Sequence, residues 1–254
     1  MVSNHKYYKT IMNCLIAAII IQSAYRSYLY RRNNLPNSIR LIGKILSNAK
    51  IQPCKLYTSG RKNSQNDEDT AIKILNNHPL FNHRIFVPPR VGNDTHWCDF
   101  AVRDYQYGWL PVNFKSTTTK SSDNVGNLSL IVYALTNFEM DVKKEYTNGP
   151  MSRVFMEKLN NWELNRQLKR DYYFVVLNKT DSSIILNSLK GLSNFTPNLY
   201  NLPFQIYWCK NSHFKYQKID KIVCLIHKTL KKPKPTWQET FMTNIRQFKP
   251  PINY

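Results

Sequence analysis

The sequence predicts an α/β domain preceded by a basic N-terminal helix. Ala71, Ile74 and Leu75 repeat at helical spacing and place a first helix at about 66–77, after a polar stretch at 59–69. Three extended segments follow at 84–87, 97–103 and 110–118, and their closeness along the chain favours an antiparallel meander. A helix followed by three strands is the expected start of the domain.

Helices and strands alternate further in the second half of the chain. Apolar spacing predicts helices at 125–137, 151–169 and 218–230, and a last helix around 237–248. Three dense apolar runs, at 172–177, 184–189 and 203–208, are typical of central strands.

The length of 254 residues favours one principal domain with appendages. Asn33, Asn34 and Pro36 form a turn-rich break after the N-terminal segment. We therefore expect residues 1–50 to form a basic amphipathic helix with its linker, and residues 51–254 to form the α/β domain. The sequence leaves the oligomeric state open, a homodimer included.

The charge of the chain points to a polyanionic partner. Lys and Arg number 36 against 16 Asp and Glu, which gives a formal net charge of +20. Such a field attracts DNA, RNA or an anionic membrane within a Debye length of about 8 Å at physiological salt. A basic protein that its charge merely keeps soluble is the alternative.

The five cysteines are scattered and include no C-x-x-C pair. They therefore encode neither a zinc site nor a disulfide framework. This usage predicts an intracellular, reducing compartment, either the cytoplasm or the nucleus.

The strongest apolar run is Ile11–Ile21, which basic residues flank on both sides. A spanning helix needs about 20 apolar residues, so the run is long enough only if the tyrosines after it lie at a membrane interface. A signal peptide fits the length of the run, but Ile21, Gln22 and Ser23 make a poor cleavage site before Ala24. The third interpretation is a single amphipathic helix.

The letters of this segment carry a motif. Ile21 and Gln22 are followed by Arg26, four positions after the glutamine, and by Arg31, five positions further on. This pattern resembles the IQ motif, the helix that calmodulin and myosin light chains bind, although Ser27 replaces the usual glycine. The resemblance implies that the apolar side of the helix enters a groove of an EF-hand partner, while Gln22 and the arginines pair with its acidic surface. A basic helix lying on the domain or on a membrane surface is the alternative.

Asp99, Asn113 and Lys115 are the main candidates for chemistry. Asp99 stands near the start of an expected strand, where its carboxylate can reach the sheet rim, and Asn113 and Lys115 share one face of the next strand. One carboxylate, one amide oxygen and one ammonium suit phosphodiester hydrolysis with Mg²⁺ or Mn²⁺, because oxygen ligands hold the metal and the lysine stabilises developing charge. An ordinary cross-strand pair of Asp99 and Lys115 is the alternative.

The order of elements and these residues resemble the PD-(D/E)xK nuclease superfamily, which includes many type II restriction endonucleases, over roughly residues 60–210. The resemblance implies a mixed central sheet flanked by helices, in α-β-β-β-α-β order, and a magnesium-dependent deoxyribonuclease. It implies that Asp99, Asn113 and Glu68 are metal ligands and that these three act with Lys115 in catalysis.

Asn113 is neutral where the family's second acid usually stands. Glu68, Asp94 or Asp123 could supply a second carboxylate, although Asp123 is equally suited to cap the helix that follows it.

We expect polar residues beside the site to hydrogen-bond the phosphate backbone of the DNA. These nucleic-acid-binding candidates are Lys62, Ser116, Thr117, Thr118 and Lys120. A solvated loop is the alternative for the stretch that follows Lys115. The sequence thus predicts a DNA endonuclease, and the alternative is a non-catalytic DNA-binding or calmodulin-binding adaptor that keeps the fold.

Overall fold

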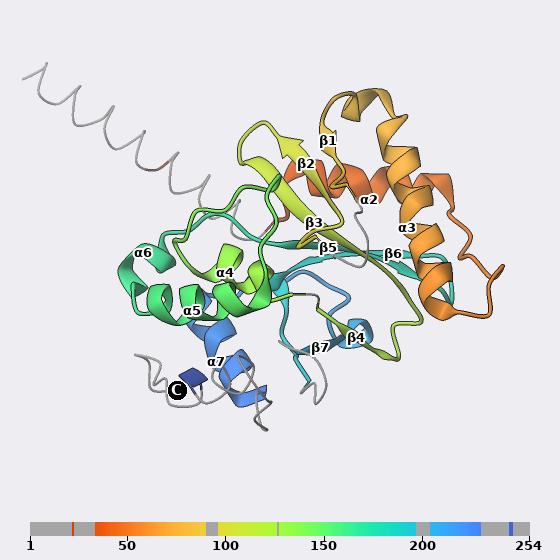
Figure 1. Cartoon of the computed structure of the whole chain (residues 1–254). Coiled ribbons are helices and arrows are strands. Elements are labelled where there is room, and N and C mark those ends of the chain that lie inside the picture. Colours follow the sequence, from red (N-terminus) through yellow and green to blue (C-terminus); the bar gives the residue numbers. More distant parts are fainter. Residues whose placement is uncertain are drawn as a thin grey trace, which may run out of the picture. The chain divides into compact units, whose positions relative to one another are not determined.

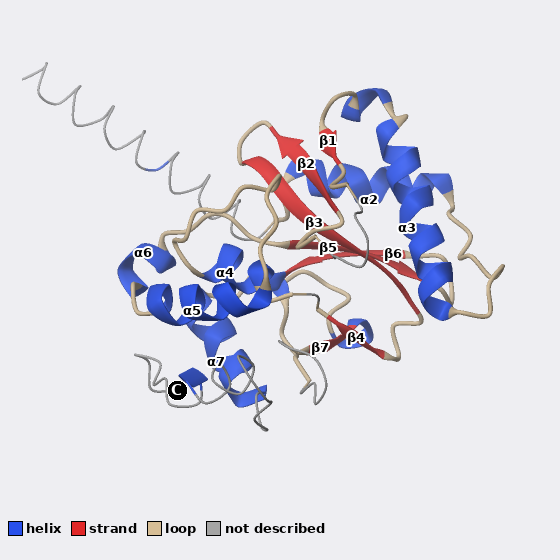
Figure 2. Ribbon diagram, in the orientation of Figure 1, coloured by secondary structure: helices blue, strands red, loops and turns tan. Residues whose placement is uncertain are grey.

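The computed structural model describes residues 22, 34–89, 96–125, 127–196, 204–229 and 244–245. The chain divides into two units, Met1–Leu35 and Pro36–Tyr254. In its described residues the second unit holds six α-helices, a mixed five-stranded sheet and a two-stranded sheet (Figures 1 and 2). The predicted α/β class is confirmed.

The five-stranded sheet has the order β1-β2-β3-β5-β6. Strands β1 (Ile85–Phe86), β2 (Phe100–Asp104) and β3 (Gly108–Thr117) form the expected antiparallel meander. Strand β5 (Tyr173–Asn178) runs parallel to β3, and β6 (Ile184–Ser188) returns antiparallel to β5. The apolar run expected at 184–189 is therefore an edge strand and not a central one.

Helices α2 (Asn37–Ala49) and α3 (Gly60–Asn76) pack on one face of this sheet. Gly43 of α2 lies directly against Leu186 of β6, so closely that a Cβ atom at this position would overlap the leucine side chain. Helix α2 thus belongs to the second unit, ahead of the boundary expected at residue 51.

Helix α3 begins earlier than its apolar spacing predicted. The Ser59 side chain accepts a hydrogen bond from the Lys62 backbone N–H and caps the helix, so most of the polar stretch expected as a linker is helical. Apolar spacing missed this part because its side chains are largely solvent-exposed, while Asp67, Ala71 and Leu75 carry the buried side.

The opposite face of the sheet carries the main hydrophobic core. Ala101, Phe174 and Val176 of the sheet pack there with α4 (Ser129–Leu135), α5 (Asn148–Leu159) and α7 (Ile219–Thr229). The helices expected at 125–137 and 218–230 are confirmed as α4 and α7.

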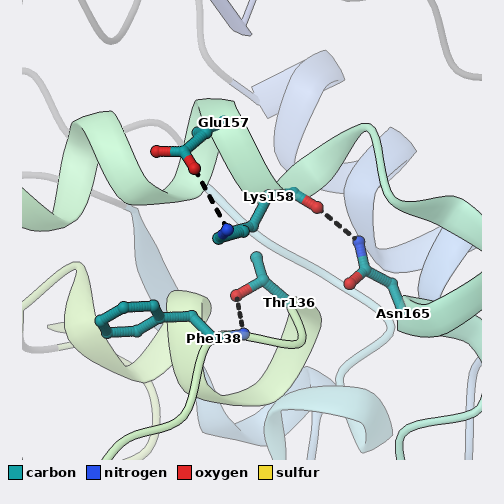
Figure 3. A network of polar contacts seen from close by, with 5 residues as sticks. All are labelled: Thr136, Phe138, Glu157, Lys158 and Asn165. Atoms are coloured by element: carbon teal, nitrogen blue, oxygen red, sulfur yellow. Dashed lines mark hydrogen bonds and ion pairs between the residues drawn. The ribbon is translucent and has the colours of Figure 1, made fainter.

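The helix expected at 151–169 is two helices, α5 and the short α6 (Trp162–Arg166). The buried Asn165 stabilises the break, because its Nδ2 donates to the Lys158 carbonyl at 3.0 Å (Figure 3). Its Oδ1 also accepts from the Asn137 N–H at 2.9 Å. An ion pair of 3.1 Å between Glu157 and Lys158 and a hydrogen bond of 3.3 Å from the Phe138 N–H to Thr136 Oγ1 lie beside it. The ends of α4 and α5 are joined through one side chain.

The last expected strand, at 203–208, does not enter the main sheet. Strand β7 (Gln205–Tyr207) pairs instead with β4 (Ser122–Asn124) in a separate antiparallel ribbon. The expected helix around 237–248 lies outside the described residues except at positions 244 and 245, which are helical. Among the described residues, no helix has both the length and the apolar content needed to cross a membrane.

Candidate active site on strands β2 and β3

Asn113 and Lys115 lie on the face of β3 that turns toward the main core. Their parallel neighbours on β5 are Phe174 and Val176, which belong to that core. Asn113 is 6% exposed, whereas Lys115 is half-buried. The two-residue period of the strand therefore brings an amide and an ammonium to one face, as the sequence predicted.

Asp99 directly precedes β2 and contacts β3 beside Asn113, through hydrogen bonds with Val112 and Phe114. Its backbone N–H donates to the Val112 carbonyl at 3.0 Å, and its Oδ2 accepts from the Phe114 N–H at 2.6 Å. Because regular pairing of β2 with β3 begins only at Phe100, the Phe114 N–H lies beyond the ladder, and the carboxylate supplies its acceptor.

The side-chain oxygen of Asn113 is buried and has no hydrogen-bond partner. Its amide group lies beside the hydroxyl of Tyr172, which is fully buried. Burial raises the pKa of Tyr172 well above its ordinary value, the negative charges of Asp99 and Glu68 raise it as well, and the hydrogen bond with Asn113 lowers it. A buried acceptor without a hydrogen-bond partner lowers the free energy of unfolding by about 1–3 kcal/mol. A ligand or a water molecule bound to Asn113 Oδ1 would remove this cost.

Glu68 comes from α3 and is half-buried. Its charge acts on Tyr172, which places its carboxylate within electrostatic range of the site. The neighbouring Asp67 has a structural role, since it is 1% exposed and accepts hydrogen bonds from the Cys54 N–H at 2.6 Å and from the Ser116 hydroxyl. Asp67 therefore fastens α3 to the other face of β3.

Strand β4 follows the end of β3, and its Asp123 lies within electrostatic range of Lys115. Burial raises the pKa of Asp123, whereas Thr117 and the positive charges of Lys115 and Lys179 lower it. Asp123 Oδ2 and Trp208 Nε1 are both buried without a hydrogen-bond partner. Asp123 is thus a strand residue facing the site, and the alternative that it caps the next helix is wrong. Asp94 lies outside the described residues.

The expected nucleic-acid contacts lie in different environments. Lys62, Thr118 and Lys120 are exposed, at the start of α3 and in the turn after β3. Thr117 is buried, with its hydroxyl 3.2 Å from that of Ser121. Ser116 points to the α3 side and donates to Asp67, so the structure places its hydroxyl away from the face that carries Lys115.

The residues of this face suit a divalent cation in part. Asp99 and Asn113 supply a carboxylate and an unpaired buried oxygen, and both are ligand types that Mg²⁺ accepts. The described residues nevertheless include no group of three or more His, Cys, Asp and Glu side chains that could hold a metal ion.

The comparisons with known proteins concern the N-terminal segment. A family model described as the IQ calmodulin-binding motif matches residues 15–33. The chain therefore carries an IQ motif, which suggests calmodulin or a light-chain-like protein as its partner. No curated protein matches the chain. Ile21, Arg26 and Arg31 lie outside the described residues, and Gln22 is helical and exposed.

Three residues of the site were missed as candidates by sequence reasoning. Tyr172 begins an apolar run that is typical of a strand, where a tyrosine suits a sheet core as well as stacking on bases. Trp208 and Lys179 directly follow strands that are distant in sequence. The sequence offers one indication of a role for Lys179, which is its position among the polar residues that follow the apolar run at 172–177.

Proposed function

We propose that this chain binds a calmodulin-like EF-hand protein through residues 15–33. The observation that carries the proposal is the match of the IQ family model to this segment. The arrangement of the segment supports it, because Ile21 can enter an apolar groove while Gln22, Arg26 and Arg31 offer hydrogen bonds and positive charge to an acidic lobe.

Calmodulin titrated into the full-length protein, with the heat of binding recorded, tests this proposal. The double variant Ile21→Asp with Arg26→Ala should weaken binding at least about tenfold, because it removes an apolar anchor and one cation.

A charge-matched control separates specific binding from the attraction of any basic protein to acidic calmodulin. Arg61→Ala with Lys62→Ala also lowers the net charge by two, but at exposed positions of α3. Equal weakening by both double variants would contradict an IQ-type complex and leave only general electrostatics.

We also propose that the α/β domain has a restriction-endonuclease-like fold and hydrolyses DNA at the face formed by Asp99, Asn113 and Lys115. What favours this second function is the coincidence of a rim carboxylate, an unpaired buried oxygen and a half-buried ammonium on adjacent strands. The order of α3, the β1-β2-β3 meander, a helical region and the parallel strand β5 supports the fold.

Hydrolysis joins a water oxygen to phosphorus and breaks the bond to one ester oxygen, which leaves with a proton. A bound divalent cation, held by Asp99, Asn113 and Glu68, would neutralise the phosphate and acidify the water. Lys115 would stabilise the charge that develops on the phosphate oxygens, and the Phe114 N–H would hold Asp99 in place throughout.

Incubation of the protein with supercoiled plasmid, with Mg²⁺, Mn²⁺ or a chelator, tests the nuclease proposal. Wild type and Asn113→Asp should be compared, because the added carboxylate would strengthen metal binding at a site that has one acid fewer than usual. Plasmid that stays intact with both proteins and both metals would leave DNA or calmodulin binding without catalysis as the function.

A further inference from the structure

Tyr105 carries an exposed aromatic ring on a turn of defined shape. Among the described residues it is the most exposed of the large apolar and aromatic side chains, at 93%, and it lies in the turn between β2 and β3 (Figure 1). The carboxylate of Asp104 holds this turn, because its Oδ1 accepts from the N–H groups of Gln106 and Tyr107 at 2.8 and 3.2 Å. Its Oδ2 accepts from the Ser38 N–H at 3.3 Å and so attaches the turn to α2.

The Tyr105 ring packs on the guanidinium of Arg84, whose Cζ lies over the ring at 4.4 Å from its centroid. This is a cation–π contact, which stabilises the position of the ring. Four of the five N–H groups of this guanidinium donate inside the protein. The Arg103 carbonyl accepts two of them, at 3.0 and 2.6 Å, and the Leu80 carbonyl and the Ser38 hydroxyl accept one each, at 3.1 and 3.0 Å. The cation beneath the ring is therefore held in place.

This arrangement leaves stacking as the interaction that the surface offers. One face of the Tyr105 ring contacts Arg84, and the high exposure of the side chain leaves the other face open to solvent. Arg84 has one N–H group left, so it does not have the pair of parallel donors that grips a phosphate. An aromatic ring already held in position loses little conformational entropy when a flat ligand stacks on it.

Charge selects the kind of flat ligand. Arg103, two residues before Tyr105, is exposed, whereas Asp104 is 7% exposed and has both oxygens in hydrogen bonds with the protein. The chain as a whole has a formal net charge of +20, so a ring attached to a polyanion suits it best, and a nucleobase is such a ring. In a duplex each base is stacked between its neighbours, so only an unpaired base has a face to offer.

We propose that the Tyr105 ring, packed on Arg84, is a stacking platform for an unpaired base of a single-stranded nucleic acid. The platform is separate from the face that carries Asp99 and Lys115, because the five residues of β2, about 17 Å of strand, lie between Asp99 and Tyr105. The proposal needs neither calmodulin binding nor DNA cleavage, since it depends only on stacking and charge.

Fluorescence anisotropy of the full-length protein with two labelled single strands of about 12 nucleotides tests the platform. One strand is oligothymidylate, and the other is an abasic strand of the same length, which keeps the phosphates and lacks the bases. Wild type should bind oligothymidylate more tightly than the abasic strand. Tyr105→Ala should weaken the binding of oligothymidylate about 5- to 100-fold, as the loss of one stacked base does, and leave the binding of the abasic strand unchanged.

Two matched variants show whether the ring at this position is responsible. Tyr105→Phe keeps the ring and should bind both strands as wild type does. Tyr57→Ala removes another exposed tyrosine, 46% exposed and ahead of α3, and should change neither affinity. Urea unfolding checks that all three variants are folded.

Three results would overturn the platform. The first is equal binding of the two strands by wild type, or no binding of either. The second is an equal loss for both strands in Tyr105→Ala, since phosphate attraction alone would then account for binding. The third is the same selective loss in Tyr57→Ala. Oligouridylate of the same length is titrated in parallel, and a selective loss with either strand supports the proposal, the tighter strand identifying DNA or RNA as the source of the base.

Discussion

Asp99 Oδ2 accepts a hydrogen bond of 2.6 Å from the backbone N–H of Phe114, the residue between Asn113 and Lys115. This contact attaches the carboxylate to the strand that carries the other two candidate groups. The relative positions of all three therefore depend on the backbone of β3 and on the residue that directly precedes β2.

Asp99→Asn tests the charge of this group without removing the acceptor, because the amide oxygen can still receive the Phe114 N–H. We expect DNA cleavage to fall by a factor of about 100 or more. DNA binding in the presence of chelator should stay the same or tighten slightly, because the basic protein loses one negative charge. Plasmid nicking and fluorescence anisotropy measure the two effects. Asp181→Asn, at an exposed acid, is the control and should change neither.

Asp67→Ala should lower the free energy of unfolding by about 2–3 kcal/mol, because it deprives the Cys54 N–H and the Ser116 hydroxyl of their acceptor inside the protein. Ser116→Ala removes only one of these donors and should cost about 1 kcal/mol. Urea denaturation followed by circular dichroism gives both values. Gln65→Ala, at an exposed position of the same helix, should stay within about 0.5 kcal/mol of wild type. A similar loss in all three variants would mean that Asp67 does not fasten α3.

The buried Lys190 makes stability depend on pH. Burial lowers the pKa of Lys190 from its ordinary value to about 8, although the charge of Asp171 raises it. A lysine in the unfolded chain titrates near about 10.4, so between about pH 8 and 10 the unfolded chain binds more protons here than the folded one. The free energy of unfolding contributed by Lys190 therefore rises with pH across this window.

The difference in unfolding free energy between wild type and Lys190→Met should grow from pH 8 to pH 10 in urea titrations. Lys190 Nζ also donates to the carbonyls of Leu168 and Arg170, so the single variant will be destabilised at every pH. The double variant Lys190→Met with Asp171→Asn removes both charges, and it replaces the single variant in this comparison if the single variant does not fold. Parallel pH profiles for wild type and these variants would show that Lys190 does not titrate in this range.

DNA binding should weaken steeply with salt. In the proposed complex with DNA, a chain with a net charge of +20 would place several cations against phosphates, and each would contribute about −0.9 to the slope of log affinity against log salt on duplex DNA. Anisotropy titrations between 50 and 200 mM NaCl, roughly the range in which such slopes are measured, would give the number of contacts. Lys120→Ala, in the exposed turn after β3, should make the slope shallower by about one if this lysine contacts the backbone. A slope near zero would rule out a nucleic-acid partner of this kind.

The sequence by itself determined the features that depend on local periodicity. Helical spacing located α4 and α7, and the two-residue period of a strand was enough to place Asn113 and Lys115 on one face. The IQ motif was also readable from its letters, because a helix that binds its partner along one side carries the pattern within a single stretch.

Contacts between distant segments decided the rest. The polar start of α3 is helical because Ser59 caps it and because Asp67 accepts a hydrogen bond from Ser116, which is 49 positions away in the sequence. Likewise, β7 pairs with β4 and not with the main sheet, and this pairing brings Trp208 to Asp123. Apolar runs show that a segment is buried, but they do not say which strand becomes its neighbour. That choice depends on packing and hydrogen bonding over the whole domain, which only the tertiary structure contains.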